Sequence, residues 1–207
     1  PGARTKFGST VWNNRIYVLG GLDINAADST TVYVSPQLNS GGDITTNWST
    51  SSASFDVARS NLTAIAYANN LYIFGGFDGA NYLSDVQYSQ INTSTGDAGT
   101  WTFSTNLHSP LADADGFSAN GYVYLLGGRS SATTCDPTTM VAPISANTTI
   151  GSGNNPTGVG AWYETNQRYS GNRYGASAVY YDGKAYVLGG GCGATLNYAS
   201  PVIQQTT

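Results

Sequence analysis

The side chains that could carry out catalysis are few and scattered along this chain. Its 207 residues include one histidine, His108, and one glutamate, Glu164. A catalytic triad would need that histidine as its base, and the sequence contains no Gly-x-Ser-x-Gly elbow to present a serine. Asp113 and Asp115 are close enough in sequence to suggest paired hydrolase carboxylates, although a solvated turn explains them more simply. We therefore expect that the chain is not an enzyme.

Metal ligands are equally sparse. A transition-metal site needs several histidine, cysteine or carboxylate ligands around one ion, and the chain has a single loop histidine. Asp43, Asp97 and Asp136 lie in segments that also hold asparagine and glycine. Because Ca²⁺ takes several oxygen ligands, a weak calcium site is an alternative, but no Asp-x-Asp-x-Asp-Gly loop is present. We expect no metal and no cofactor.

The composition indicates an all-β protein and argues against two kinds of partner. Only 10% of the residues are charged, against about a quarter in ordinary proteins, and residues that favour strands and turns are plentiful. A formal net charge of −4 without a basic cluster argues against nucleic acid, whose phosphates need several cations. No apolar run approaches the ~20 residues of a membrane span. The chain begins at Pro1 rather than at methionine, so we expect a segment of a longer protein.

A pentapeptide of the form Tyr-apolar-apolar-Gly-Gly recurs along the chain. Its four copies are residues 17–21, 72–76, 124–128 and 186–190. Their first glycines stand 55, 52 and 62 residues apart. Recurrence at a nearly regular spacing is the signature of a repeat architecture.

The sequence around each pentapeptide also repeats. A turn-forming pair precedes every copy: Asn13-Asn14, Asn69-Asn70, Asn120-Gly121 and Asp182-Gly183. Such pairs tolerate positive φ and suit two-residue hairpins. A third strand follows each Gly-Gly, and a tryptophan then opens a fourth strand at Trp48, Trp101 and Trp162. Each repeat therefore predicts a four-stranded antiparallel sheet, with small residues on its first strand.

A single sheet of this kind cannot bury both faces, but radial stacking around a central channel does so. We therefore predict a β-propeller, formed by residues 1–207 as one segment. The blades are expected at about 4–58, 59–110, 111–172 and 173–207, and the last one lacks the tryptophan of an outer strand. The first strand of each blade lies nearest the channel. The paired glycines allow neighbouring backbones to approach closely.

These features resemble kelch repeats. The resemblance rests on the apolar run that ends in Gly-Gly, the later tryptophan, and Phe77-Asp78-Gly79 after the second Gly-Gly. It covers nearly the whole chain and implies a β-propeller, but it says little about function. Kelch-like propellers include intracellular adaptors, bacterial secreted proteins and the copper enzyme galactose oxidase. The Ser/Thr/Asn/Gly-rich connections here are most similar to those of the bacterial surface proteins.

The resemblance also bears on the chemistry and on the ring. Galactose oxidase-like copper chemistry needs two histidines, and this segment has one. Kelch rings usually hold more than four blades, so we expect missing blades or another chain to complete this ring. A closed ring of four blades is the alternative.

One face of the propeller should carry the binding residues. Because neighbouring strands run in opposite directions, the loops after Gly-Gly and the connections between blades emerge on the same face. The candidate ligand-binding residues on this loop face are Asp23, Asp78, Asn81, Tyr82, His108, Arg129, Arg168, Tyr169, Arg173 and Tyr174. Tyrosine, arginine and amide side chains suit a glycan or a protein partner.

We therefore expect a non-catalytic, extracellular bacterial module for binding or adhesion. Two alternatives stay open. The segment could belong to a propeller enzyme, an oxidase or a glycosidase, whose catalytic residues lie elsewhere, or it could be a structural spacer in a surface assembly.

Three arginines share one position in their repeats. Arg4, Arg59 and Arg173 each stand 16 residues before the first glycine of their Gly-Gly pair. In register, they gather near the mouth of the channel and form a patch that accepts an anion or a carboxylate, as arginines at such positions do in some kelch adaptors. The alternative is that they bond to loop carbonyls.

The two cysteines predict a disulfide. Cys135 follows the third Gly-Gly by seven residues and Cys192 follows the fourth by two, which places both in loops on the same face of adjacent blades. An even cysteine count in a lysine-poor chain fits an oxidising compartment. We therefore expect a bond between them and a location outside the cell or on its surface. Two unrelated free thiols are the alternative.

Overall fold

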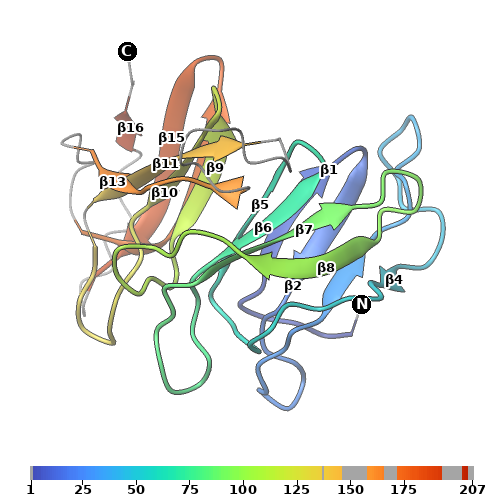
Figure 1. Cartoon of the computed structure of the whole chain (residues 1–207), viewed down its shortest axis with the longest axis horizontal. Helices are drawn as coiled ribbons and strands as arrows, with labels where there is room; N and C mark the ends of the chain where they lie inside the picture. Colours follow the sequence, from blue (N-terminus) through green and yellow to red (C-terminus); the bar gives the residue numbers. More distant parts are fainter. Residues whose placement is uncertain (1, 137, 146–157, 166–171, 193–201, 205–207) are drawn as a thin grey trace.

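The computed structural model describes residues 2–136, 138–145, 158–165, 172–192 and 202–204. Within these ranges the chain forms sixteen β-strands and no helix, and the strands make four antiparallel sheets (Figure 1). No helix in this part of the chain is long and apolar enough to cross a membrane. The prediction of an all-β fold is therefore confirmed.

Each sheet is one blade, and its strands follow the order of the chain. Blade 1 consists of β1 (Gly8–Trp12), β2 (Arg15–Leu19), β3 (Val32–Val34) and β4 (Ser49–Thr50). Blade 2 consists of β5 (Thr63–Tyr67), β6 (Asn70–Phe74), β7 (Val86–Ile91) and β8 (Ala98–Phe103). Blade 3 consists of β9 (Asp115–Ala119), β10 (Tyr122–Leu126), β11 (Thr139–Ser145), β12 (Gly158–Val159) and β13 (Tyr163–Glu164). Blade 4 consists of β14 (Tyr174–Tyr181), β15 (Lys184–Gly191) and β16 (Val202–Gln204).

The outer edges of blades 3 and 4 differ from those of the first two blades. In blade 3 the short strands β12 and β13 both pair with β11, one near each of its ends, so the predicted fourth strand is divided in two. Trp162 directly precedes β13, and Trp101 lies within β8. In blade 4 the described residues form three strands, as expected for a repeat that lacks the outer-strand tryptophan.

The first two strands of every blade form a hairpin with a tight turn. Asn13-Asn14, Asn120-Gly121 and Asp182-Gly183 occupy these turns with positive φ, as predicted. In blade 2 the predicted turn is one residue too late, because Asn70 already belongs to β6 and pairs with Tyr67. The turn there is Ala68-Asn69, and the side chain of Asn70 donates to the carbonyl of Ala68 at 3.1 Å.

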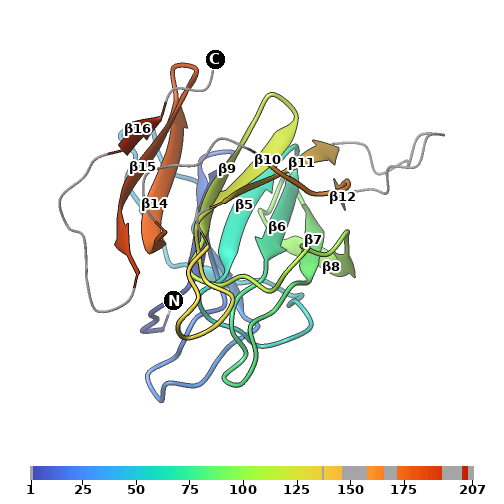
Figure 2. The same ribbon diagram turned by 90° about the vertical axis from the view of Figure 1, so that its left-hand side faces the viewer.

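The innermost strands β1, β5, β9 and β14 line a central channel. β5 packs against β1 and β9, and β14 packs against β9; Figure 2 shows β14, β9 and β5 side by side. Two cavities of about 270 and 390 Å³ lie along the channel, and residues from all four blades line them. Small residues such as Ala64 and Ala176 allow the strands to crowd there, as the sequence predicts.

The hydrophobic core lies between the blades. Alternate residues of each second strand face the preceding and the following blade, because side chains alternate along a strand. Tyr17 and Leu19 of blade 1 thus pack with Ile73 of blade 2. The same alternation fills the interface between blades 2 and 3. A smaller cluster around Leu126 and Val187 joins blades 3 and 4.

The Gly-Gly pairs bring the next blade into backbone contact. The second glycine donates its N–H to a carbonyl of the next blade: Gly21 to Arg59 at 2.9 Å, Gly76 to Leu111 at 2.8 Å and Gly128 to Arg173 at 2.9 Å. A Cβ on Gly20 would lie 2.7 Å from the Arg59 oxygen, and one on Gly75 would overlap the oxygen of Leu111. The predicted close approach of neighbouring backbones is therefore confirmed.

A second set of backbone hydrogen bonds runs around the mouth of the channel. Lys6, Asn61, Asp113 and Gly175 occupy equivalent positions near the start of each innermost strand, with left-handed φ values of 54°, 55°, 56° and 64°. The N–H of Asn61 donates to the Lys6 carbonyl at 2.7 Å, that of Asp113 to Asn61 at 2.9 Å, and that of Gly175 to Asp113 at 2.8 Å. We call these four residues the rim chain. It joins the four blades in order.

Alanine at Gly75 should destabilise the protein far more than alanine at Gly121. Both glycines have positive φ, 54° and 78°, so both variants suffer the left-handed strain of about 1–2 kcal/mol. Only Gly75→Ala also drives a Cβ into the next blade, since no atom of the described residues lies within 4 Å of a Cβ at Gly121. We expect Gly75→Ala to cost at least about 2 kcal/mol more in urea unfolding. Equal losses would contradict the close approach at Gly-Gly.

Candidate functional site

The loops after Gly-Gly fold back as short hairpins. Isolated bridges close them: Leu22 with Asp28, Phe77 with Tyr82, and Arg129 with Cys135. The Asp23 carboxylate accepts the N–H groups of Asn25 and Ala27 at 2.8 and 3.0 Å, and Asp78 accepts those of Ala80 and Asn81 at 2.9 and 2.6 Å. These backbone bonds hold the pKa of each carboxyl below its ordinary value. Asp23 and Asp78 therefore shape their own loops.

Tyr82, Arg129 and Tyr174 come together from three blades. The Cζ atom of Arg129 lies 4.7 Å from the ring centroid of Tyr174 and 5.8 Å from that of Tyr82. Its Nε donates to a carboxylate oxygen of Asp113 at 2.6 Å. Phe77 packs beside Tyr82, with ring centroids 5.0 Å apart. We call Tyr82, Asp113, Arg129 and Tyr174 the arginine–tyrosine cluster.

The cluster keeps a charge and donors that a partner could use. Burial works against the charge of Arg129, but the hydrogen bond and negative charge of Asp113 outweigh it and raise the pKa of the guanidinium. The two side chains are 23% and 18% exposed, so the ion pair reaches the surface. No bond from the terminal nitrogens of Arg129 is found among the described residues. Cation–aromatic contacts hold the group in place.

The cluster stands over the mouth of the channel. Asp113 lines the cavity of about 270 Å³ together with Lys6 and Asn61. Asp115 lines the channel too, and its carboxylate accepts the N–H of Ala178 in blade 4 at 2.8 Å. Burial raises the pKa of Asp115, although this hydrogen bond opposes the effect. The two aspartates noted in the sequence therefore have separate partners, one in the cluster and one in blade 4.

Two of the three equivalent arginines are buried within their own blades. Arg59 is 0% exposed; it binds both carboxylate oxygens of Asp85 at 2.8 and 2.9 Å and donates to the Gly75 carbonyl at 2.9 Å. Arg173 is 5% exposed and donates to the equivalent carbonyl, that of Gly189, at 2.7 Å. The prediction of an anion-accepting patch is therefore wrong for these two residues, because their guanidiniums brace the Gly-Gly turn instead of facing solvent.

Arg4 and the remaining predicted residues do not join the cluster in the part of the chain that is described. Arg4 lies over the ring of Tyr33, 5.5 Å from its centroid, and contacts its hydroxyl at 3.4 Å. Asn81 bonds to Asp78 within their hairpin. His108 is exposed in the connection between β8 and β9. Arg168 and Tyr169 lie outside the described residues.

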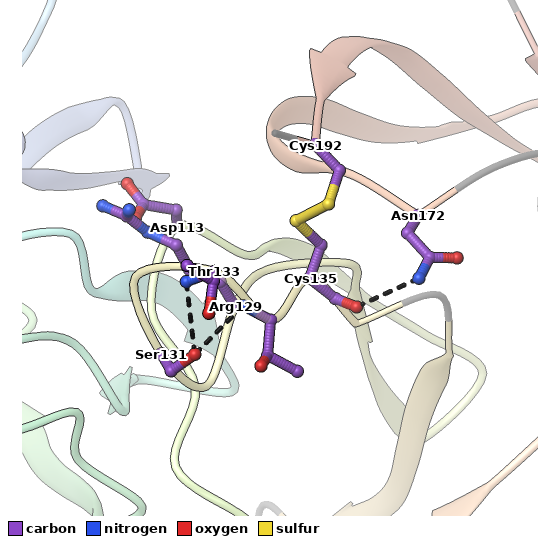
Figure 3. Close-up of a disulfide and its surroundings, with 8 residues drawn as sticks. Asp113, Arg129, Ser131, Thr133, Cys135, Asn172 and Cys192 are labelled. Carbon is purple, nitrogen blue, oxygen red and sulfur yellow. Dashed lines mark hydrogen bonds and ion pairs between the residues drawn. A yellow bond between two sulfur atoms is a disulfide. The ribbon is translucent and has the colours of Figure 1, made fainter. Parts of the chain in front are cut away.

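The structure contains the predicted disulfide between Cys135 and Cys192, whose Cα atoms are 6.0 Å apart (Figure 3). Cys135 belongs to the loop hairpin of blade 3, and Cys192 directly follows β15 of blade 4. The carbonyl of Cys135 also accepts a hydrogen bond from Asn172 at 3.3 Å. The bond therefore links blades 3 and 4 beside the loop that carries Arg129.

A polar hollow at the opposite end of blade 2 is absent from the sequence-based prediction. It measures about 730 Å³, and hydroxyl and amide side chains line much of it, among them Ser52, Asn69, Asn70, Gln90 and Thr102. The Oδ1 atom of Asn70 is buried without a hydrogen-bond partner among the described residues. The predicted binding face is the one with the long loops, whereas this hollow lies at the end of the blade where the turns are short. The sequence feature that could indicate this hollow is the run of asparagine and threonine around residues 92–95.

The aspartates considered as calcium ligands have separate partners. Asp97 accepts hydrogen bonds from the hydroxyls of Ser51 and Ser52, each at 2.6 Å. Asp43 accepts one from the Asn39 amide at 3.1 Å, and Asp136 accepts one from the Thr138 hydroxyl at 2.6 Å. The described part of the chain contains no group of three or more His, Cys, Asp or Glu side chains that could hold a metal ion.

Removing the partner of Arg59 should cost much more stability than removing the partner of Arg129. Asp85→Asn leaves a fully buried guanidinium without its counter-charge, for which we expect about 3 kcal/mol. Asp113→Asn disturbs a pair that reaches solvent and should cost about 1 kcal/mol or less; asparagine also tolerates the positive φ there. Urea unfolding of the two variants measures the difference. A neutral Asp85→Asn would show that Arg59 is not a structural brace.

The disulfide should be formed in the native protein and should stabilise it. Alkylation without reductant should label no thiol, and alkylation after reduction should label both cysteines, as read by intact mass. The bond spans 57 residues of sequence, so the chain-entropy model gives about 4 kcal/mol of stabilisation. The double variant Cys135→Ser/Cys192→Ser should lose stability of that order in urea unfolding. Labelling of native, unreduced protein would contradict the bond.

Comparison with known proteins supports the assignment made from the repeats. Residues 58–88, which run from the connection before β5 into β7, match the family model described as Kelch motif. No curated protein matches the chain, and the distant likeness to galactose oxidase stays a prediction. The matched segment contains the second Gly-Gly pair, and the other blades repeat its strand order. Residues 58–88 thus match a kelch motif, and the four repeated sheets have the strand order expected for the blades of a kelch-like β-propeller.

Proposed function

We propose that this chain is a non-catalytic extracellular module that binds a protein partner through the arginine–tyrosine cluster. Kelch repeats indicate a β-propeller protein-binding module. The cluster supports a position for the binding site, because Tyr82, Arg129 and Tyr174 meet on the loop face of three blades. Tyrosine and arginine are the residue types that dominate binding energy in protein interfaces.

The geometry of the cluster favours a polypeptide as ligand. Arg129 is already oriented by Asp113 and by two aromatic rings, so little side-chain entropy is lost when a partner binds. Its terminal nitrogens can donate to a backbone carbonyl or a carboxylate, while the tyrosine rings offer apolar surface. The channel mouth beneath the cluster adds room for one side chain of the partner, since the cavity there measures about 270 Å³.

An extracellular location is supported by two observations. The chain contains a disulfide between blades 3 and 4, and such bonds persist in oxidising compartments. It is also poor in lysine and rich in serine, threonine and glycine. We propose secretion or display on a bacterial surface. A role as a fragment of a propeller enzyme or as a passive spacer predicts no ligand for the cluster.

A glycan is the second candidate ligand, and the polar hollow of blade 2 favours it. Its amide and hydroxyl lining can exchange hydrogen bonds with sugar hydroxyls. The exposed Gln90 and the half-buried Tyr88 stand in this lining. A glycan array with the wild-type protein and with Gln90→Ala tests this candidate. Retention of a glycan that is lost on Gln90→Ala would support it, and an array without any retained glycan would contradict it.

Selection from a displayed library of random peptides tests the proposed protein-binding function. We expect the chain to enrich peptides, and the variants Tyr174→Ala and Arg129→Ala to bind them at least about tenfold more weakly, since hot-spot truncations cost ~2 kcal/mol or more. Titration of enriched peptides by fluorescence anisotropy measures the loss.

Tyr122→Ala is the matched control for this experiment. Tyr122 is 38% exposed and begins β10, directly after the tight turn at the opposite end of blade 3. Its truncation should leave peptide binding unchanged. If no peptide is enriched, or if all three variants bind as well as wild type, the cluster is not the binding site.

A further inference from the structure

The disulfide and the arginine–tyrosine cluster join the same two hairpins. Cys135 is the bridge partner of Arg129 in the loop hairpin of blade 3. Gly191, which directly precedes Cys192, pairs with Tyr174 in the first hairpin of blade 4. Figure 3 shows the disulfide beside the hairpin that carries Arg129. The sulfur–sulfur bond and the contact between Arg129 and Tyr174 are therefore neighbouring links across one junction.

The junction between blades 3 and 4 has less apolar contact than the junction before it. Thirteen buried residues form the cluster between blades 2 and 3. Among the described residues, the cluster between blades 3 and 4 has two, Leu126 and Val187. Because apolar burial is the main attraction between packed elements, the covalent bond supplies a larger share of the cohesion here. Tyr174 belongs to blade 4, so its position over Arg129 depends on that cohesion.

The other contacts of Arg129 do not cross this junction. Its backbone exchanges two hydrogen bonds with Ala112 of the same blade, at 2.8 and 2.9 Å. Its Nε donates to Asp113, also in blade 3, and its second aromatic neighbour, Tyr82, belongs to blade 2. A displacement of blade 4 would therefore remove Tyr174 from the cluster and leave the rest of it in place.

We propose that the disulfide between Cys135 and Cys192 is a thiol-dependent switch on the binding site. The oxidised form holds Tyr174 beside Arg129, and reduction of the bond by a dithiol releases blade 4 and weakens binding of the partner. This inference rests on the protein-binding function proposed above and adds a means of regulating it.

The exchange reaction begins at the more accessible cysteine. Cys135 is 6% exposed, whereas Cys192 is only half-buried. A thiolate of the dithiol bonds to the sulfur of Cys192, and the electron pair of the broken sulfur–sulfur bond leaves on Cys135. The second thiolate of the dithiol then displaces Cys192 from this mixed disulfide. Both cysteines take up a proton, and the dithiol becomes a disulfide.

Binding of a peptide enriched from the displayed library, measured before and after treatment with dithiothreitol, tests the proposal. We expect reduction to weaken binding about tenfold, as Tyr174→Ala does in the oxidised protein, because both remove the same aromatic contact. In the reduced protein Tyr174→Ala should weaken binding less than about twofold further, whereas Arg129→Ala should still weaken it several-fold. Cys135→Ser/Cys192→Ser is the matched control, whose affinity should not respond to dithiothreitol.

Amide hydrogen exchange of wild-type protein tests the same switch without a ligand. The amides of Gly128 and Gly175 donate across the junction between blades 3 and 4, and that of Asn61 donates across the junction between blades 1 and 2. After reduction, the two glycine amides should exchange at least about tenfold faster, and the Asn61 amide should keep its rate. Unchanged exchange of the glycines overturns the proposal. An equal rise at Asn61 also overturns it, because reduction would then unfold the whole protein.

The binding experiment separates failure of the switch from failure of the proposed function. Equal affinity of the oxidised and reduced protein for an enriched peptide overturns the switch and leaves the function standing. Selection that enriches no peptide overturns the function, and the switch with it. Alkylation and intact mass confirm that dithiothreitol has reduced both cysteines.

Discussion

The backbone hydrogen bonds between neighbouring blades are the constraint on which the rest of the structure depends. Asn61, Asp113 and Gly175 each donate to the equivalent residue of the preceding blade, and the Gly-Gly pairs donate in the opposite direction along the chain. These bonds form only if two backbones meet without side chains between them. Glycine therefore stands where a Cβ would strike the next blade, and the rim positions adopt left-handed φ. The hydrophobic layers between blades follow from this spacing.

The candidate binding site is a product of the same contacts. Asp113 contributes its backbone to the rim chain and its carboxylate to Arg129, so the bond that orders the blades also orients the guanidinium. Tyr82 and Tyr174 reach Arg129 because the rim chain holds blades 2, 3 and 4 side by side. The disulfide from Cys135 to Cys192 holds the Arg129 loop against blade 4. Three blades therefore share this surface, and no single blade could form it alone.

The sequence predicts the fold well because its signals are local and repeated. Gly-Gly, the turn pairs and the tryptophans each mark a backbone conformation, so strand order and blade number follow, with one turn displaced at Asn70. The sequence places Tyr82, Arg129 and Tyr174 on the loop face, but the contact between them depends on distances between blades that no local pattern contains. Arg59 shows the same limit. Its position in the repeat is predicted correctly, but its ion pair with Asp85, which directly precedes β7, makes it a buried structural residue.

Residue-resolved amide hydrogen exchange tests the central claim most directly. The amides of Asn61, Asp113 and Gly175 belong to residues that are partly or fully exposed at the channel mouth, yet each is bonded to the preceding blade. If these bonds hold the blades together, the three amides exchange as slowly as those of the buried strand β6, because opening requires the blades to separate. Exchange as fast as that of the exposed loop residue Ile24 would contradict the account.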